Sequence, residues 1–109
     1  MTASNATRLD GLVAIVTGAA GGVGRATVKL LVERGAKVVA EDVDKSVVEL
    51  ASGNANMAAV VGDARNASSA AEAVEVANRR FGGVHILVNN AAVILSKDIL
   101  ETSEAEWTD

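Results

Sequence analysis

Three glycines near the start of the chain are spaced to bind a phosphate. Gly18, Gly22 and Gly24 follow an apolar run at residues 12–16 and precede a segment with helical periodicity. Where a helix begins after a glycine-rich turn, backbone N–H groups without internal partners point outward, and the helix dipole attracts an anion. A tight turn would also require glycines, so the loop alone leaves a purely structural turn open as the alternative. Their spacing, Gly-x3-Gly-x-Gly, differs from the commoner Gly-x-Gly-x2-Gly.

An acidic residue lies where a dinucleotide site needs one. Asp42 follows the second apolar run, 18 residues after Gly24 (42 − 24). A carboxylate at about this distance accepts hydrogen bonds from the hydroxyls of an adenosine ribose and repels a 2′-phosphate. Gly21 and Val43 stand where a basic residue would accommodate that phosphate, which favours NAD over NADP. Two alternatives stay open: Asp44 shares or takes the role, or Asp42 is only a solvated strand end.

Short apolar runs alternate with helical segments along the chain. We expect strands at residues 12–16, 38–40, 57–61 and 84–88, and helices from about residue 23, at 45–51, at 68–80 and from residue 102 or 103. The apolar runs are continuous and rich in branched residues, as in parallel strands covered on both faces. This alternation predicts an α/β fold with a parallel sheet and right-handed crossovers.

Periodicity and capping signals predict the buried face and the ends of the helices. For the first helix the expected inner residues are Val23, Ala26, Thr27, Leu30 and Leu31, with a C-terminal cap at Gly35. For the helix at 68–80 they are Ala70, Ala73, Val74, Ala77 and Phe81. Its N-cap is either Asn66 or Ser69 with Glu72, and Gly82-Gly83 ends it. Asp44 is the expected N-cap of the helix at 45–51.

Composition excludes several classes of protein. The 109 residues carry a formal net charge of −4, which argues against a general nucleic-acid binder. Absence of cysteine excludes disulfides, thiolate nucleophiles and cysteine-type zinc sites. No run approaches the roughly 18–20 apolar residues of a membrane span. We expect a cytoplasmic protein with a disordered leader at residues 1–8 and one domain at residues 9–109.

Several of these motifs together resemble one family. Thr17-Gly18-Ala19-Ala20-Gly21-Gly22-Val23-Gly24 resembles the Thr-Gly-x3-Gly-x-Gly motif of the short-chain dehydrogenases/reductases. Gly62-Asp63 resembles that family's acidic residue near the adenine, and Asn89-Asn90-Ala91-Ala92 its Asn-Asn-Ala-Gly motif, with Ala92 replacing glycine. The resemblance runs from about Leu9 to Asp109.

The resemblance implies a Rossmann-like sheet of order 3-2-1-4 with helices on both faces, the incomplete half of a doubly wound fold. It implies NAD as cofactor, with Gly18 to Gly24 on the pyrophosphate and Asp42 on the adenosine ribose. Asp63 and Ala64 would border the adenine, and Asn90 and Ala91 would approach the ribose from the fourth strand. Asn89 would tie the middle of the sheet together.

The resemblance also implies that the catalytic residues lie elsewhere. The family's Asn, Ser and Tyr-x3-Lys residues all follow the helix start near Trp107, and the chain contains no tyrosine. We therefore name no catalytic residue here, and His85, which opens a strand, is expected to be structural. The alternative to the NAD(H)-binding portion of an oxidoreductase is a non-catalytic nucleotide-binding or self-assembling module. With its outer edge unpaired, the fourth strand predicts a homo-oligomer through that side.

Overall fold

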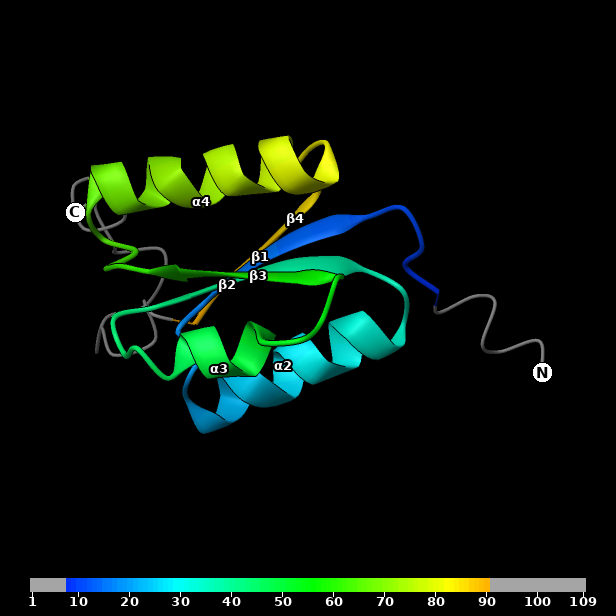
Figure 1. Cartoon of the computed structure of the whole chain (residues 1–109), viewed down its shortest axis with the longest axis horizontal. Helices are drawn as coiled ribbons and strands as arrows, with labels where there is room; N and C mark the ends of the chain where they lie inside the picture. The colour runs from blue at the N-terminus through cyan, green and yellow to red at the C-terminus, as the bar shows by residue number, and fades with distance from the viewer. Residues whose placement is uncertain (1–7, 91–109) are drawn as a thin grey trace, which may run out of the picture.

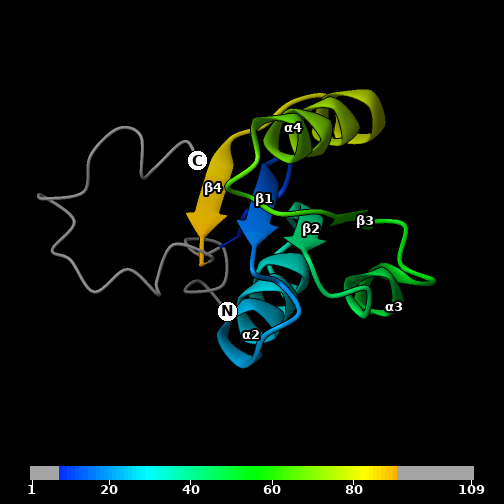
Figure 2. The ribbon, with the colours of Figure 1, turned by 90° about the vertical axis from the view of Figure 1, so that its left-hand side faces the viewer.

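The chain folds into a four-stranded parallel sheet with helices on both faces (Figures 1 and 2). The computed structural model describes residues 8–90. The strand order is β3-β2-β1-β4, which confirms the predicted order 3-2-1-4. The elements are β1 (Val13–Thr17), α2 (Gly22–Glu33), β2 (Lys37–Asp42), α3 (Val47–Ala51), β3 (Met57–Val61), α4 (Ala67–Phe81) and β4 (Ile86–Asn89).

Strand register brings the polar strand ends together. Thr17 at the end of β1 pairs with Glu41 of β2 on one side and with Asn89 of β4 on the other. Asp42, the last residue of β2, pairs with Val61 of β3. All pairs are parallel, so the carboxyl ends of the four strands share one edge of the sheet. The side chains that carry the candidate chemistry lie along this edge.

Each face of the sheet has its own core (Figure 1). Toward α2 and α3, the core is built from Ala14, Val16, Ala19, Val28, Val38, Ala40, Val47 and Met57. Toward α4, it is built from Val13, Ile15, Val39, Ala58, Val60, Ala73, Val76 and Ala77. Every residue of β1 is buried, as a continuous apolar strand covered on both faces requires.

The inner face of α2 is rotated relative to the prediction. Val23 is 72% exposed and Leu30 is also exposed, whereas Gly24 and Val28 are buried and Leu31 packs against the core. A Cβ on Gly24 would collide with the carbonyl oxygen of Gly18. The close crossing of the helix start over the loop therefore fixes Gly24 inside and turns Val23 outward.

The long helix α4 agrees with the prediction at both ends and differs at two predicted inner positions, Ala70 and Val74, which are both exposed. Asn66 is the N-cap, accepting a 2.9 Å hydrogen bond from the amide of Ser68, so the first of the two capping alternatives is correct. The helix ends at Gly82, as predicted. Val76 is buried where Val74 was expected, and Val74 is 43% exposed.

Two other elements begin later than predicted because side chains bond to the backbone before them. Asp44 accepts a hydrogen bond from the amide of Ser46, and α3 begins only at Val47, with Ser46 as the N-cap residue. The imidazole Nδ1 of His85 accepts a 2.9 Å hydrogen bond from the amide of Val13. His85 is therefore structural, as predicted, and β4 begins at Ile86.

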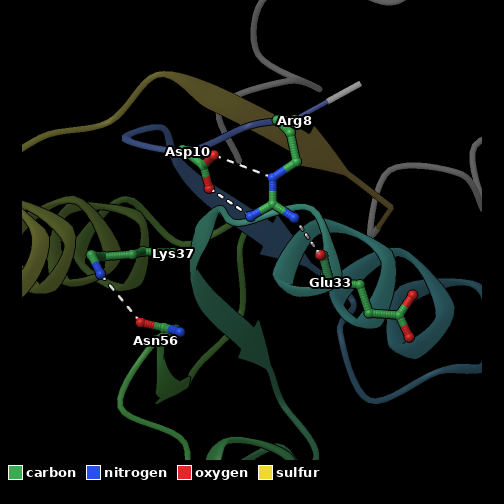
Figure 3. A network of polar contacts seen from close by, with 5 residues as sticks. All are labelled: Arg8, Asp10, Glu33, Lys37 and Asn56. Atoms are coloured by element: carbon green, nitrogen blue, oxygen red, sulfur yellow. Dashed lines mark hydrogen bonds and ion pairs between the residues drawn. The ribbon is translucent and has the colours of Figure 1, made fainter. Parts of the chain in front are cut away.

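At the opposite, amino-terminal end of the sheet, one surface ion pair and several hydrogen bonds join neighbouring segments (Figure 3). The guanidinium of Arg8 donates to both oxygens of Asp10, at 2.7 and 3.2 Å, and to the carbonyl oxygen of Glu33 at the end of α2. Lys37 donates to the side-chain oxygen of Asn56 at 3.2 Å. These contacts hold the segment before β1 and the start of β2, far from the carboxyl-end edge.

Candidate functional site

The glycine loop leaves the start of α2 open to an anion. Gly21 is the N-cap residue, no side chain caps this end of the helix, and no acidic residue lies in its first turn. The first amides of a helix lack internal partners, and no acidic side chain of this first turn competes with a phosphate for them. Gly18, at φ +64°, turns the chain out of β1, and Gly24 allows the helix to cross closely above it. The loop fits a pyrophosphate.

Hydrogen bonds from two backbone amides hold the carboxylate of Asp42 in position. Oδ2 accepts a 2.9 Å hydrogen bond from Ala20 of the glycine loop, and Oδ1 accepts a 2.9 Å bond from Asp44. Each carboxylate oxygen has a second lone-pair site, so both can still accept a ribose hydroxyl. Asp44 instead turns to the amide of Ser46, and that bond is the first cause of the lowered pKa of its carboxyl.

A cavity of about 230 Å³ opens between the ends of β2 and β3. Its lining residues are Gly18, Glu41, Asp42, Val43, Gly62, Asp63, Ala64 and Arg65, and we call it the adenosine cleft. Asp63 is paired with Arg65, whose guanidinium donates to Oδ1 at 3.1 Å and to Oδ2 at 2.9 Å. These bonds lower the pKa of the Asp63 carboxyl to about 2, so it is ionised at neutral pH.

A side-chain hydrogen bond joins the end of β4 to the end of β1. The hydroxyl of Thr17 donates to the side-chain oxygen of Asn89 at 3.0 Å and lies 3.4 Å from the carbonyl oxygen of Val88. This bond agrees with the structural role predicted for Asn89. Asn90 has a buried side-chain nitrogen without a hydrogen-bond partner among the described residues, and Ala91 lies outside them.

The structure thus brings most of the predicted site residues to one edge. Gly18, Asp42, Asp63 and Ala64 line the same opening. The rest of the glycine loop is tied to β2 by the Ala20–Asp42 bond and by a 3.1 Å bond from the amide of Ala19 to the carbonyl oxygen of Glu41. Asn90 follows β4 two strands away from Asp42 in the sheet.

One residue at this edge was missed from the sequence. Glu41 is only 1% exposed, lines the adenosine cleft and has an oxygen, Oε2, without a hydrogen-bond partner in the described part of the chain. Burial, followed by the nearby charges of Glu72 and Asp63, raises the pKa of its carboxyl to about 7. An acidic residue that directly follows the apolar run Val38–Ala40 and precedes Asp42 was the signal that could have found it.

A second cavity of about 420 Å³ lies between α4 and the β1–β4 side of the sheet. It is mainly apolar, and we call it the α4 groove. Its lining residues are Ile15, Thr17, Glu41, Ala64, Ala67, Ala70, Ala73, Val74, Val84, Leu87 and Asn89. Glu41 and Ala64 line both the groove and the adenosine cleft.

Two kinds of site are absent from residues 8–90. No helix in this part of the chain is long and apolar enough to cross a bilayer. Nor do three histidine, cysteine or acidic side chains gather there in a way that could hold a metal ion.

Comparison with known proteins identifies relatives across almost the whole chain. The sequence model of the short chain dehydrogenase family matches residues 12–109. A 3-oxoacyl-(acyl-carrier-protein) reductase of Vibrio cholerae is 38% identical over 106 residues, which cover 93% of this chain and 42% of the reductase. The peroxisomal multifunctional enzyme type 2 of Drosophila melanogaster is 37% identical over 116 residues, covering 92% of this chain and 19% of that enzyme.

Solved structures give the same picture. A short-chain dehydrogenase/reductase of Brucella melitensis superposes with a TM-score of 0.74 at 33% identity, covering 92% of this chain and 44% of that one. A 3-ketoacyl-(acyl-carrier-protein) reductase of the same organism, solved in complex with NADH, superposes with a TM-score of 0.67 at 38% identity, covering 72% and 33%. The chain spans less than half the length of these relatives. The glycine loop, the Asp42 carboxylate and the strand order agree with these matches. The chain therefore belongs to the short-chain dehydrogenase/reductase family.

Proposed function

We propose that this chain binds NAD(H) through the adenosine and pyrophosphate half of the dinucleotide. The observation that carries the proposal is the carboxylate of Asp42, held by the amides of Ala20 and Asp44 beside an uncapped helix start. A carboxylate fixed in this way meets ribose hydroxyls without first having to be ordered. Membership of a family with an NADH-bound structural neighbour supports the same ligand.

The pyrophosphate would lie on the start of α2. The amides of Gly22, Val23 and Gly24 are in the first turn, and Gly18, Ala20 and Gly21 shape the loop that approaches the phosphates. The adenine would enter the adenosine cleft beside Asp63 and Ala64. Asn90 and Ala91 are proposed to approach the ribose from the end of β4, as the family resemblance implies.

Preference for NAD over NADP is part of the proposal. Asp42 would repel a 2′-phosphate, and the neighbouring Val43 provides no charge to hold one. Arg25 is the nearest basic side chain to this loop in sequence, and its guanidinium already donates to the carbonyl oxygen of Ala20 at 2.8 Å and to the hydroxyl of Ser46. A 2′-phosphate would have to compete with those bonds.

In the whole protein, we propose, the reaction is hydride transfer between nicotinamide and an alcohol or ketone. The bound nicotinamide supplies the hydride donor or acceptor. The residues of this chain bind and orient the dinucleotide, and none of them is assigned a proton-transfer role. The proposal places the protein in the cytoplasm, which fractionation of the source cells would test.

Calorimetric titration of the 109-residue chain tests the cofactor proposal. We expect weak NAD binding, weaker NADP binding, and competition by ADP-ribose or AMP nearly as strong as by NAD. If ligands without the nicotinamide did not bind, the proposal that binding rests on the adenosine and pyrophosphate half would be wrong.

Replacing Asp42 tests its role directly. D42A removes the ribose acceptor and should weaken NAD binding about tenfold or more, because hydrogen bonds to a charged group contribute about 1.5–3 kcal/mol. The matched control is D44A, which removes the neighbouring carboxylate that bonds only to Ser46. A larger loss from D44A than from D42A would assign the ribose to Asp44.

A second proposal is self-association of this chain through the β4 side. Among the described strands, β4 pairs with β1 alone, and its other edge is unpaired. Leu87 of β4 is 64% exposed beside the α4 groove. A second copy related by a two-fold axis would pair the two edges and cover both grooves. Sedimentation velocity should show a dimer forming at micromolar concentration, and a monomer at every concentration would refute the proposal.

A further inference from the structure

The buried carboxyl of Glu41 has no role in the nucleotide contacts described above. Its side chain lies on the face of the sheet that α4 covers, together with that of Thr17, its partner in β1. Only 1% of Glu41 is exposed. Its Oε2 has no hydrogen-bond partner among residues 8–90. A buried charge without a partner is costly, so a carboxyl in this position is stabilised by carrying a proton.

Within residues 8–90, no neighbouring element offers a free positive charge to Glu41. Asp42 adjoins it on β2, and Asp63 lies in the loop before α4. From α4, Glu72 faces it with the same charge. β1 and β4 contribute the uncharged Thr17 and Asn89 to the shared groove. Arg65 is the one cation lining the cleft in the described part of the chain, and its guanidinium is bonded to Asp63.

Glu41 also lies directly behind one wall of the adenosine cleft. The wall is formed by residues 62–65, between β3 and α4. A Cβ on Gly62 would lie 2.6 Å from the hydroxyl oxygen of Ser69 and 3.6 Å from Oε2 of Glu41, so the wall, α4 and Glu41 are in close contact. The amide of Gly62 donates to the carbonyl oxygen of Asp42 at 2.9 Å, which ties the wall to β2.

We propose that Glu41 is a proton-controlled positioning residue for the adenosine cleft. With its proton, it permits residues 62–65 and the first turns of α4 to pack against β2. Without it, the unpaired negative charge displaces this wall and adds to the charges of Asp42 and Asp63 beside the dinucleotide. The link to the dinucleotide rests on the proposed function, whereas the movement of the wall does not.

The raised pKa fixes the direction and the pH window. The pKa of Glu41 rises from 4.5 to about 7 in the folded chain. Between these values the folded state holds a proton that the unfolded state has released, so stability falls as pH rises and levels off above about 7. Across that window the folding equilibrium constant should decrease by up to roughly tenfold per pH unit.

Comparison of the wild-type chain with E41Q tests the first step. Glutamine has nearly the same shape and no charge, so E41Q should lack this part of the pH dependence. Unfolding of both chains by urea, followed by circular dichroism from pH 5 to pH 9, measures the difference. E75Q is the matched control, since Glu75 lies on the exposed side of α4 in an ion pair with Arg79, and it should follow the wild type. Equal pH profiles for wild type and E41Q would overturn the proposal.

Two further measurements separate this inference from the cofactor proposal. Hydrogen exchange, corrected for intrinsic rates, should show residues 62–70 less protected at pH 8 than at pH 6 in the wild type and equally protected in E41Q. The affinity for ADP-ribose should fall roughly threefold or more over the same interval in the wild type alone. Absence of ADP-ribose binding at every pH would refute the proposed function, while unchanged protection of residues 62–70 would refute the role of Glu41.

The inference can also be tested without a variant. If E41Q does not fold, a carbon-13 titration of the wild-type carboxyls decides the matter. The Glu41 signal should titrate near pH 7, and a midpoint near 4.5 would overturn the proposal.

Discussion

The two faces of the sheet are covered to different degrees. On the face toward α2 and α3, two helices bury the central strands, and the glycine loop closes against them through Gly24. On the other face, α4 is the one helix of residues 8–90 that covers the sheet, and the α4 groove lies between it and the β1–β4 side. Val28 is buried on the first face, while Val74 and Leu87 are exposed on the second.

This difference separates two tasks. The α2–α3 face is closed among the described residues and carries the loop that would hold the phosphates. The α4 face exposes the apolar side chains Val74 and Leu87, through which we proposed self-association, and it contains the one buried carboxyl of residues 8–90. The phosphate loop is therefore expected to depend on tight packing, and the α4 face to respond to association and to pH.

The largest expected effect is on the closed face, at Gly24. G24A places a Cβ against the carbonyl of Gly18, and the backbone must shift, so we expect a loss of about 3 kcal/mol or more in the free energy of unfolding. The loss would run against helix propensity, which favours alanine over glycine by about 1 kcal/mol. Urea unfolding followed by circular dichroism provides the measurement.

The control for this prediction is another glycine in the same loop. A Cβ on Gly22 would meet no atom within 4 Å. We expect G22A to leave the free energy of unfolding within about 0.5 kcal/mol of wild type. Equal effects of G22A and G24A would show that the helix crossing is looser than described.

A pair of valine truncations compares the two faces directly. V28A removes two methyl groups from a side chain that is 1% exposed, and it should cost about 2 kcal/mol. V74A removes the same atoms from the edge of the α4 groove and should cost less than about 0.5 kcal/mol. Measured at low protein concentration, a cost for V74A equal to that of V28A would show that the α4 face is already closed in the monomer.

The smallest effect on stability is expected at Leu87, where association should change instead. L87K introduces a charge on the unpaired edge of β4 and should alter the free energy of unfolding by no more than about 0.5 kcal/mol. Sedimentation velocity should show loss of the proposed dimer. V48K, at an exposed position of α3, is the control and should associate like the wild type. A dimer that persists in L87K would place the contact elsewhere.

Much of the fold could be predicted because its signals are local. The continuous apolar run before the glycine loop predicted β1, Asn66 and Gly82 predicted the ends of α4, and the bounds of β3 were predicted without error. The strand order followed from the resemblance to a family, since periodicity alone does not determine which strands are neighbours.

The errors arose where tertiary contacts override periodicity. Val23 fits the apolar spacing of α2, but the crossing at Gly24 turns it outward. His85 fits the strand pattern, yet its ring bonds to the amide of Val13 and β4 begins after it.

Prediction of the site has the same limit. Position and charge identified Asp42, but its two amide partners come from residues 22 positions before it and two after it, and such contacts depend on the folded loop. Glu41 looked like the end of a strand, and only its packing beneath α4 distinguishes it from a solvated carboxylate.

The bond between Asp42 and the amide of Ala20 also bears on how relatives of this chain would change their cofactor. A neutral or basic residue at position 42 would remove the repulsion of a 2′-phosphate, but it would also release the loop from the end of β2. A change of coenzyme choice at this position is therefore expected to require a second substitution that re-anchors the Ala20 amide. Laboratory redesign that alters position 42 alone should gain tolerance for the extra phosphate and lose affinity for both coenzymes.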